Sequence, residues 1–284
     1  VFCLNELPDL AARIQVALLN VLEERDVQIR GYALRLPLDV LLVASANPED
    51  YTNRGRIITP LKDRFGAEIR THYPLDVEAE IEVVRQESHL VAEVGEPLLE
   101  VLARFVRNLR ESPAIDQRSG VSARFAVAAA ETVAAAALRR SALTGEHPAV
   151  ARPVDLDAVP SVLRGKLEFE PGEEGREIEH LVHLLRRAIA ETARERFAGL
   201  DLRPLSDAVA DGHLVATGER VPGRDVLAAL PELPVLHEVA QRAGVSADEP
   251  AGRIAAAVEL ALESLYLARR LAKDSDDSIT VYGQ

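Results

Sequence analysis

Apolar and polar positions in the first third of the chain follow the patterns of strands. Residues 1–7 predict a buried strand, and residues 41–46 form a continuous apolar run typical of a strand covered on both faces. Between them, residues 26–37 alternate apolar and polar positions on either side of Gly31 and Tyr32, which predicts a β-hairpin. The sequence therefore predicts a small sheet with a hairpin inserted between two of its strands.

Helical spacing accounts for most of the remaining chain. Apolar residues spaced three and four apart predict a first helix over residues 8–24, with Pro8 in its first turn. Further helices are expected at residues 76–94 and 96–111, at 122–143, which is Ala-rich, and at about 174–197, which is long and charged. Residues 250–273 predict a final amphipathic helix, with apolar residues in register on one face. Residues 200–235 show no clear period, and residues 273–284 form a polar tail.

The change from strands to helices near residue 75 predicts a domain boundary. We expect an α/β domain over residues 1–75, a helical domain over residues 76–147 and a mainly helical region over residues 148–284. No internal repeat is visible.

Composition limits the classes of function. The net charge of −13 argues against nonspecific binding to nucleic acid, which needs a basic surface. No run of 18 uncharged apolar residues exists, so we expect no membrane span. Cys3 is the single cysteine, which excludes an internal disulfide and fits a reducing cytoplasm. Because Cys3 lies in the predicted buried strand, we expect it to be a small core residue.

Polar side chains follow both predicted strands. Asn5 and Glu6 come directly after the first apolar run, and Asn47 follows the second. Hydrolysis of a nucleotide needs an oxygen ligand that orients Mg²⁺ or its waters and a carboxylate that orients the attacking water. Both groups must project from a rigid element because in-line attack depends on accurate placement. These residues are therefore candidates for a nucleotide site.

Two arginines extend this pattern. Arg64 lies at the end of a short amphipathic segment, where its guanidinium can reach a phosphate bound to a neighbouring subunit. Arg124 lies at the start of a predicted helix in the next domain.

The order of these motifs resembles the AAA+ ATPases of the magnesium chelatase subunit I and MoxR branch. Residues 5–31, NELPDLAARIQVALLNVLEERDVQIRG, are similar to the end of the Walker B strand, its helix and the pre-sensor hairpin. LLVASANPED resembles the sensor 1 strand, LKDRFG the arginine-finger segment, and GVSARFAVAAAETVAAA the sensor 2 helix of the lid. The resemblance covers residues 1 to about 143.

The resemblance implies a role for each candidate residue. Glu6 corresponds to the catalytic base, and Asn5 to the residue on the metal side of the nucleotide. Asn47 corresponds to sensor 1, Arg64 to a finger acting in trans, and Arg124 to sensor 2. The implied fold is the C-terminal part of a P-loop AAA+ core, with a parallel sheet and a hairpin insertion, followed by an all-α lid and the helical C-terminal region.

Two features depart from the family pattern. Asn5 stands where the family has aspartate, so we expect weaker Mg²⁺ affinity rather than loss of activity. The G-x-x-x-x-G-K-[ST] phosphate loop is absent, and the family places it before Walker B. Since the sequence begins at Val1 and contains no methionine, we expect a fragment that starts at Walker B and is inactive without the upstream loop.

Simpler explanations exist for several of these residues. Asn5 and Glu6 can cap the following helix, Asn47 can be part of a turn, and Arg64 can pair with a surface acid. Arg124 can face solvent. His180 and His183, three residues apart beside glutamates, invite a metal site, but a charged helix is the favoured interpretation.

We therefore expect a ring-forming cytoplasmic ATPase that binds ATP and Mg²⁺ and remodels a partner protein or inserts a metal into it. The resemblance implies a homo-oligomeric ring and a partner with a von Willebrand A-type domain, which the hairpin at residues 26–37 would contact. The alternative is a hydrolysis-deficient AAA+-derived module that only binds other proteins.

Overall fold

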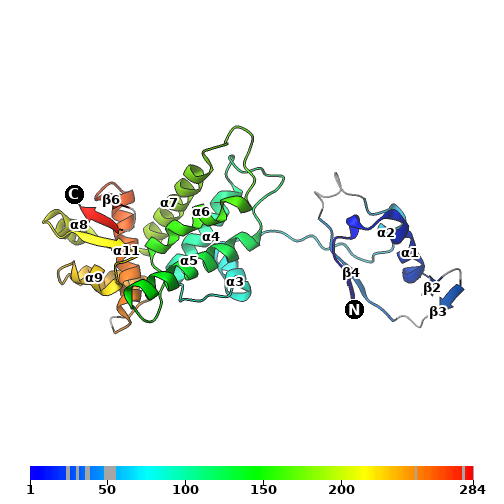
Figure 1. The fold of residues 1–284 in the computed structure, drawn as a ribbon, viewed down its shortest axis with the longest axis horizontal. Helices are drawn as coiled ribbons and strands as arrows, with labels where there is room; N and C mark the ends of the chain where they lie inside the picture. Colours follow the sequence, from blue (N-terminus) through cyan, green and yellow to red (C-terminus); the bar gives the residue numbers. More distant parts are fainter. Residues whose placement is uncertain are drawn as a thin grey trace. The chain divides into compact units, whose positions relative to one another are not determined.

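The computed structural model describes residues 1–23, 26–29, 32–35, 39–47, 56–246, 248–276 and 279–283. The chain forms two compact units, Val1–His72 and Tyr73–Gln284 (Figure 1), and each is described by itself. The structure is mixed α/β, with a small parallel sheet in the first unit and a separate antiparallel sheet in the second.

The first unit contains short strands and helices that alternate along the chain. Its elements are β1 (Phe2–Leu4), η1 (Leu7–Asp9), α1 (Ala12–Glu23), β2 (Asp26–Ile29), β3 (Tyr32–Arg35), β4 (Leu42–Ala44) and α2 (Thr59–Lys62). Strands β2 and β3 pair antiparallel, with Val27 opposite Leu34, which confirms the predicted hairpin. Of its predicted turn residues, Gly31 lies outside the described residues.

The two apolar strands pair in parallel, as neighbours of one sheet. Strand β1 aligns with β4 so that Phe2 faces Leu42 and Leu4 faces Ala44. The prediction that these strands are buried is wrong in this structure, because the described part of the unit covers them only in part. Phe2 is 53% exposed and Val43 is 47% exposed. Cys3 is also exposed, so it is not the small core residue that its neighbours suggested.

The second unit is built mainly from helices. They are α3 (Val77–Glu87), α4 (Glu96–Arg110), α5 (Ala123–Thr144), α6 (Ala158–Leu163), α7 (Glu177–Arg196), α8 (Arg203–Ala210), α9 (Gly223–Ala228), α10 (Pro234–Arg242) and α11 (Ala251–Leu267). Two 3-10 turns, η3 (Pro153–Asp157) and η4 (Arg164–Lys166), flank α6. Strands β5 (Val215–Gly218), β6 (Ala272–Asp276) and β7 (Ile279–Gly283) form a sheet in the order β5-β7-β6.

Local signals explain where several helices begin and end. Asp76 caps α3 by accepting a hydrogen bond from the Ala79 amide at 2.8 Å, and Ser122 caps α5 by accepting one from the Arg124 amide at 3.2 Å. Gly145 ends α5 in the left-handed conformation that glycine favours. Helix α3 ends at Glu87, so the predicted helix over residues 76–94 is too long.

The C-terminal sheet was not predicted. The predicted polar tail at residues 273–284 contains strand β7 and most of β6, and β7 pairs antiparallel with both β5 and β6. Helix α11 ends at Leu267, before the predicted end at residue 273. Tyr282 is only 1% exposed, so this tail is part of the folded core.

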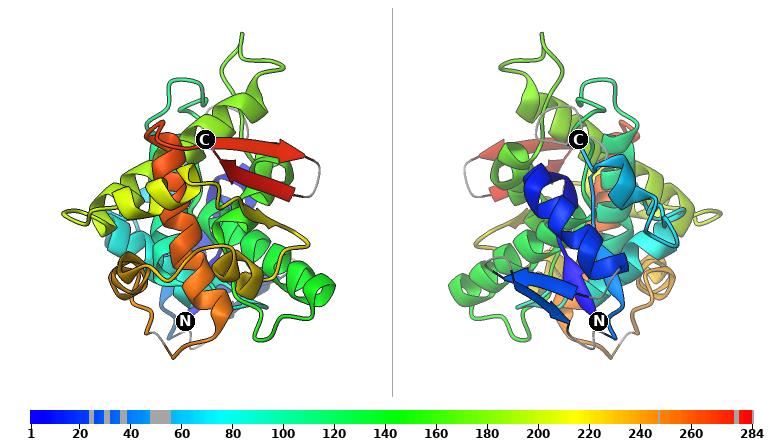
Figure 2. Two further views of the ribbon diagram at one scale, coloured as in Figure 1. Left: turned by 90° about the vertical axis from the view of Figure 1, so that its left-hand side faces the viewer. Right: turned by 90° about the vertical axis from the view of Figure 1, so that its right-hand side faces the viewer.

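One hydrophobic core runs through the second unit. Helix α4 buries Leu98, Leu102, Phe105 and Leu109 at spacings of four, three and four residues, and it packs against α7. Helix α11 packs against α7, α9 and α10 (Figure 2). Because residues from α3 to β7 belong to one core, the predicted boundary near residue 147 does not separate two cores.

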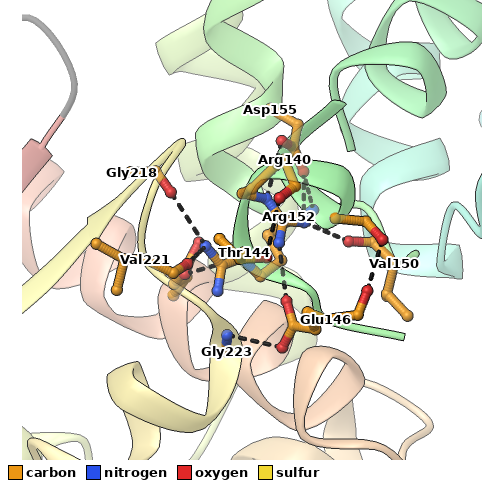
Figure 3. Close-up of polar contacts among 11 residues, drawn as sticks. Arg140, Thr144, Glu146, Val150, Arg152, Asp155, Gly218, Val221 and Gly223 are labelled. Carbon is orange, nitrogen blue, oxygen red and sulfur yellow. Dashed lines mark hydrogen bonds and ion pairs between the residues drawn. The ribbon is translucent and has the colours of Figure 1, made fainter. Parts of the chain in front are cut away.

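Charged side chains are buried in this core beside η3. The Arg140 guanidinium pairs with Asp155 and Glu146, both at 3.0 Å, and donates to the Val150 carbonyl (Figure 3). Arg152 is fully buried and donates to the Val221 carbonyl at 2.7 Å. These contacts join α5 and η3 to the segment between β5 and α9.

Candidate functional site

The candidate site lies in the first unit, where β1 and β4 end. Because the two strands are parallel neighbours, Asn5 and Glu6 leave the sheet at the same edge as Ser45 and Asn47. The Ser45 amide donates to the Leu4 carbonyl at 2.9 Å, which extends the pairing to this point. Asn5, Glu6 and Asn47 therefore all follow strands that end side by side at the same edge of the sheet.

Glu6 has a fixed and unusual backbone conformation. Its φ of 53° and ψ of 53° lie in the left-handed region, which is costly for a residue with a Cβ. The Glu6 amide donates to Ser45 Oγ at 3.1 Å, and the next amide, that of Leu7, donates to the Ser45 carbonyl at 2.9 Å. These contacts hold the backbone around Glu6 against β4 while its side chain stays exposed.

Gln15 of α1 is a buried polar side chain that links separate segments of the first unit. Its side chain is 1% exposed and donates to the carbonyls of Leu10 and Arg56, at 2.8 and 3.2 Å. It also accepts a hydrogen bond from the Ile58 amide at 2.9 Å. Gln15 therefore joins α1 to the segment that leads into α2. Gln15 carries no signal in the sequence, because a single glutamine in an amphipathic helix is normally solvated.

Arg64 is engaged within its own unit. Its Nε donates to Glu23 Oε1 at 3.0 Å, and a second guanidinium nitrogen also contacts this oxygen. The side chains are 35% and 50% exposed, so this is a partly solvated pair of small energetic value. Glu23 of α1 therefore holds the Arg64 side chain in this structure. The action of Arg64 on a neighbouring subunit stays a prediction.

Further charges along the segment after α2 are solvated. Glu68 lies 3.0 Å from Arg70 and 3.8 Å from Lys62. The hydrogen bond and charge of Arg70, followed by the charge of Lys62, hold the pKa of Glu68 below its ordinary value. Glu68 is therefore a charged surface residue and adds no reactive acid to the site.

Arg124 belongs to the second unit. It is exposed in the first turn of α5, and its amide donates to the capping Ser122. The predicted position at the start of a helix is confirmed, and its predicted action on a nucleotide stays a prediction.

His180 and His183 lie on α7, and His180 pairs with a nearby glutamate. His180 Nε2 lies 2.6 Å from Glu173 Oε2. Within the described ranges, no group of three or more histidine, cysteine, aspartate or glutamate side chains is arranged to hold a metal ion.

The edge of the first sheet offers exposed oxygen donors. Asn5 supplies an amide oxygen and Glu6 a carboxylate, the ligand types that Mg²⁺ and its bound waters prefer. Their solvent exposure leaves room for a ligand. In chemical type, an exposed carboxylate can orient a water and an amide oxygen can accept a hydrogen bond from a metal-bound water.

Comparisons with known proteins do not assign the chain to a family. A scan against protein-family models, a search of curated proteins and a search of solved structures each found no match. In the described part of the chain, no helix has both the length and the apolar character needed to cross a bilayer.

Proposed function

We propose that this chain is part of a Mg²⁺-ATP-dependent AAA+ ATPase of the magnesium chelatase and MoxR type. The observation that carries the proposal is the parallel pairing of β1 and β4, which brings Asn5 and Glu6 to the same sheet edge as Asn47. The hairpin that follows α1 and the helix-starting position of Arg124 add support, since both occur in the order expected from the resemblance.

The proposed roles follow from the chemistry of each group. The Glu6 carboxylate orients the water that attacks the γ-phosphate, and its anchored backbone limits misplacement of that water. Asn5 holds a water of the Mg²⁺ shell, and Asn47 contacts the γ-phosphate from the neighbouring strand. Bound Mg²⁺ would neutralise charge that develops on the phosphates.

Arg64 and Arg124 have the proposed roles that require an assembled ring and the helical unit. Arg64 would stabilise charge on a nucleotide held by the next subunit, and Arg124 would report the nucleotide state to the helical unit. Breaking the ion pair between Arg64 and Glu23 costs only about 0–1 kcal/mol, because exposed ion pairs are weak. Hydrolysis in the ring would drive remodelling of a partner protein or insertion of a metal into it.

The decisive experiment measures ATP turnover of the full-length protein with Glu6→Gln and Arg64→Ala. We expect each variant to lose about 100-fold or more in turnover, because each removes a group that acts only in the transition state. Glu23→Gln is the matched control, since it removes the partner of Arg64 and leaves the guanidinium in place. Undiminished turnover in both Glu6→Gln and Arg64→Ala refutes the proposal.

A second candidate function is a protein-interaction module that binds nucleotide without hydrolysing it. Two observations favour it: Asn5 replaces the aspartate that the family uses, and Arg64 is paired with Glu23. Metal-dependent nucleotide binding by the full-length protein without turnover would select this function over the first.

A further inference from the structure

Ser45 directly follows β4 and makes three hydrogen bonds to the segment that contains Glu6. Its amide donates to the Leu4 carbonyl at 2.9 Å, and its carbonyl accepts from the Leu7 amide at 2.9 Å. Its hydroxyl oxygen accepts from the Glu6 amide at 3.1 Å. The chain from Leu4 to Leu7 is therefore folded around one residue at the end of the neighbouring strand.

The two ends of this short turn are fixed without the hydroxyl. Leu4 belongs to β1, which pairs with β4, and Leu7 is 1% exposed, so burial holds its side chain in place. Both backbone hydrogen bonds of Ser45 are independent of the side chain at this position. Substitution of Ser45 therefore removes the contact with the Glu6 amide and leaves the rest of the turn in place.

The hydroxyl acts on the residue of the turn whose conformation is costly. Glu6 has a φ of 53° and a ψ of 53°, which residues with a Cβ adopt only when their surroundings enforce it. Water can satisfy an amide at this exposed position, so the hydroxyl is not needed to avoid an unpaired donor.

What the hydroxyl adds is a fixed direction. A hydroxyl beside a paired strand has a set position, whereas a water molecule can move with the peptide group. The hydroxyl therefore sets the direction of the Glu6 N–H bond and, with it, the backbone from which the Glu6 side chain projects.

We propose that Ser45 is a positioning residue for ATP hydrolysis, because its hydroxyl holds Glu6 in the left-handed conformation from which the carboxylate acts. The inference rests on the proposed function, in which Glu6 orients the attacking water. Ser45 acts only through Glu6 in this role. One hydrogen bond of ordinary strength shifts a conformational equilibrium about fivefold. We expect turnover to change by a similar factor, since only molecules with Glu6 correctly placed can react.

The first test compares Ser45→Val with Ser45→Thr in the 284-residue chain. The two new side chains are similar in shape, and only threonine keeps a hydroxyl. NMR measurements that report the φ angle of Glu6 are made on both variants without nucleotide. We expect the ratio of left-handed to other conformations of Glu6 to fall about fivefold in Ser45→Val and to stay at the parent value in Ser45→Thr. Unchanged chemical shifts of the β1 and β4 amides show that the strands still pair.

The second test measures kcat and KM for ATP with the full-length protein. We expect kcat to be about fivefold lower in Ser45→Val, with KM unchanged, and to return to the parent value in Ser45→Thr. In a Glu6→Gln background, Ser45→Val should cause no further loss, because the carboxylate that it positions is absent. A general loss of stability would instead lower turnover in both backgrounds.

Three results would each overturn the inference. The first is an unchanged conformation of Glu6 in Ser45→Val, and the second is an equal kcat in Ser45→Val and Ser45→Thr. The third is an equal loss of turnover from Ser45→Val with Glu6 and with Gln at position 6. These results leave the proposed function standing, whereas absence of ATP turnover in the unsubstituted full-length protein would overturn the proposed function and this inference together.

Discussion

Replacing Glu259 by glutamine tests whether a buried carboxyl limits the stability of the second unit at neutral pH. Glu259 lies on α11, is 2% exposed, and its Oε1 is 3.3 Å from Nε of the fully buried Arg152. Neither of these two atoms makes a hydrogen bond within the described structure. Arg140 of α5, Asp155 of η3 and Glu263 of α11 also act on this carboxyl.

The direction of the effect follows from the pKa. Burial raises the pKa of Glu259 from its ordinary 4.5 to about 7, and the charges of Arg152 and Arg140 only partly oppose this. The folded protein therefore binds a proton more tightly than the unfolded chain does. The stabilisation is fully present below pH 4.5 and is lost as the pH rises through about 7. The pKa difference between the folded and the unfolded chain corresponds to about 3 kcal/mol of stability, at about 1.4 kcal/mol per pKa unit.

The assay is urea unfolding of parent and Glu259→Gln chains, followed by circular dichroism between about pH 5 and about pH 8. Glutamine resembles the protonated carboxyl, so the two chains should be similarly stable at the acid end. Between about pH 5 and about pH 8 the parent should lose about 2.5 kcal/mol relative to the variant. As a control, Glu232→Gln replaces an exposed glutamate. Its free energy of unfolding should stay within about 0.5 kcal/mol of that of the parent at every pH.

Destabilisation of the Glu259→Gln chain near pH 8 would contradict this prediction. If Arg152 and Glu259 form a strong buried ion pair, removal of the carboxylate leaves an uncompensated cation and costs about 3–5 kcal/mol. Glu259→Gln would then be the less stable chain, and most so near pH 8. That result would refute the conclusion that the cost of burying Glu259 exceeds its attraction to the arginines.

Two further substitutions test the packing. Gln15→Leu should destabilise the first unit by about 1–3 kcal/mol, because it removes the partner of the Ile58 amide, and faster hydrogen exchange in α1 would show this. Exchange rates equal to those of Gln86→Leu, a change at an exposed glutamine, would refute it. Gly223→Ala should cost about 1–3 kcal/mol in urea unfolding, because its Cβ would lie 2.7 Å from Glu146 Oε1 and 3.0 Å from the nearest backbone carbon. A stability equal to that of Gly165→Ala would refute this.

The fold was predictable where a local pattern decided the structure. The hairpin and the amphipathic helices α1 and α11 were found because a face of each element repeats with the period of its backbone. Strands β6 and β7 pair with each other locally, but both were missed because KDSDDSITVYGQ is polar and lacks a clear apolar alternation. The pairing of β7 with β5 spans more than 50 residues, so it leaves no local signal either.

The candidate site was predictable only as a set of residue types. A polar pair after an apolar run suggested Asn5 and Glu6, and parallel pairing then brought Asn47 to the same edge. The sequence had no signal for the left-handed conformation of Glu6, which depends on contacts with Ser45 from 39 residues away. The Arg64–Glu23 pair was equally hidden, because any of several acids could have been the partner.

The two units use charged groups in opposite ways, and this difference decides where a site should be sought. Strongly shifted pKa values often mark reactive residues, and Glu259 is the clearest case of a raised carboxyl pKa in the described chain. Yet Glu259 is closed off from solvent among Arg152 and core residues, so a substrate cannot reach it. Glu6 has the reverse properties, with an exposed carboxylate on a backbone held in a costly conformation by the adjacent strand. Strain is retained where the surrounding structure enforces it, and an accessible charged group at such a point can meet a ligand. Glu6 is therefore the accessible candidate for a functional role, whereas Glu259 is a core residue whose ionisation opposes folding as the pH rises through about 7.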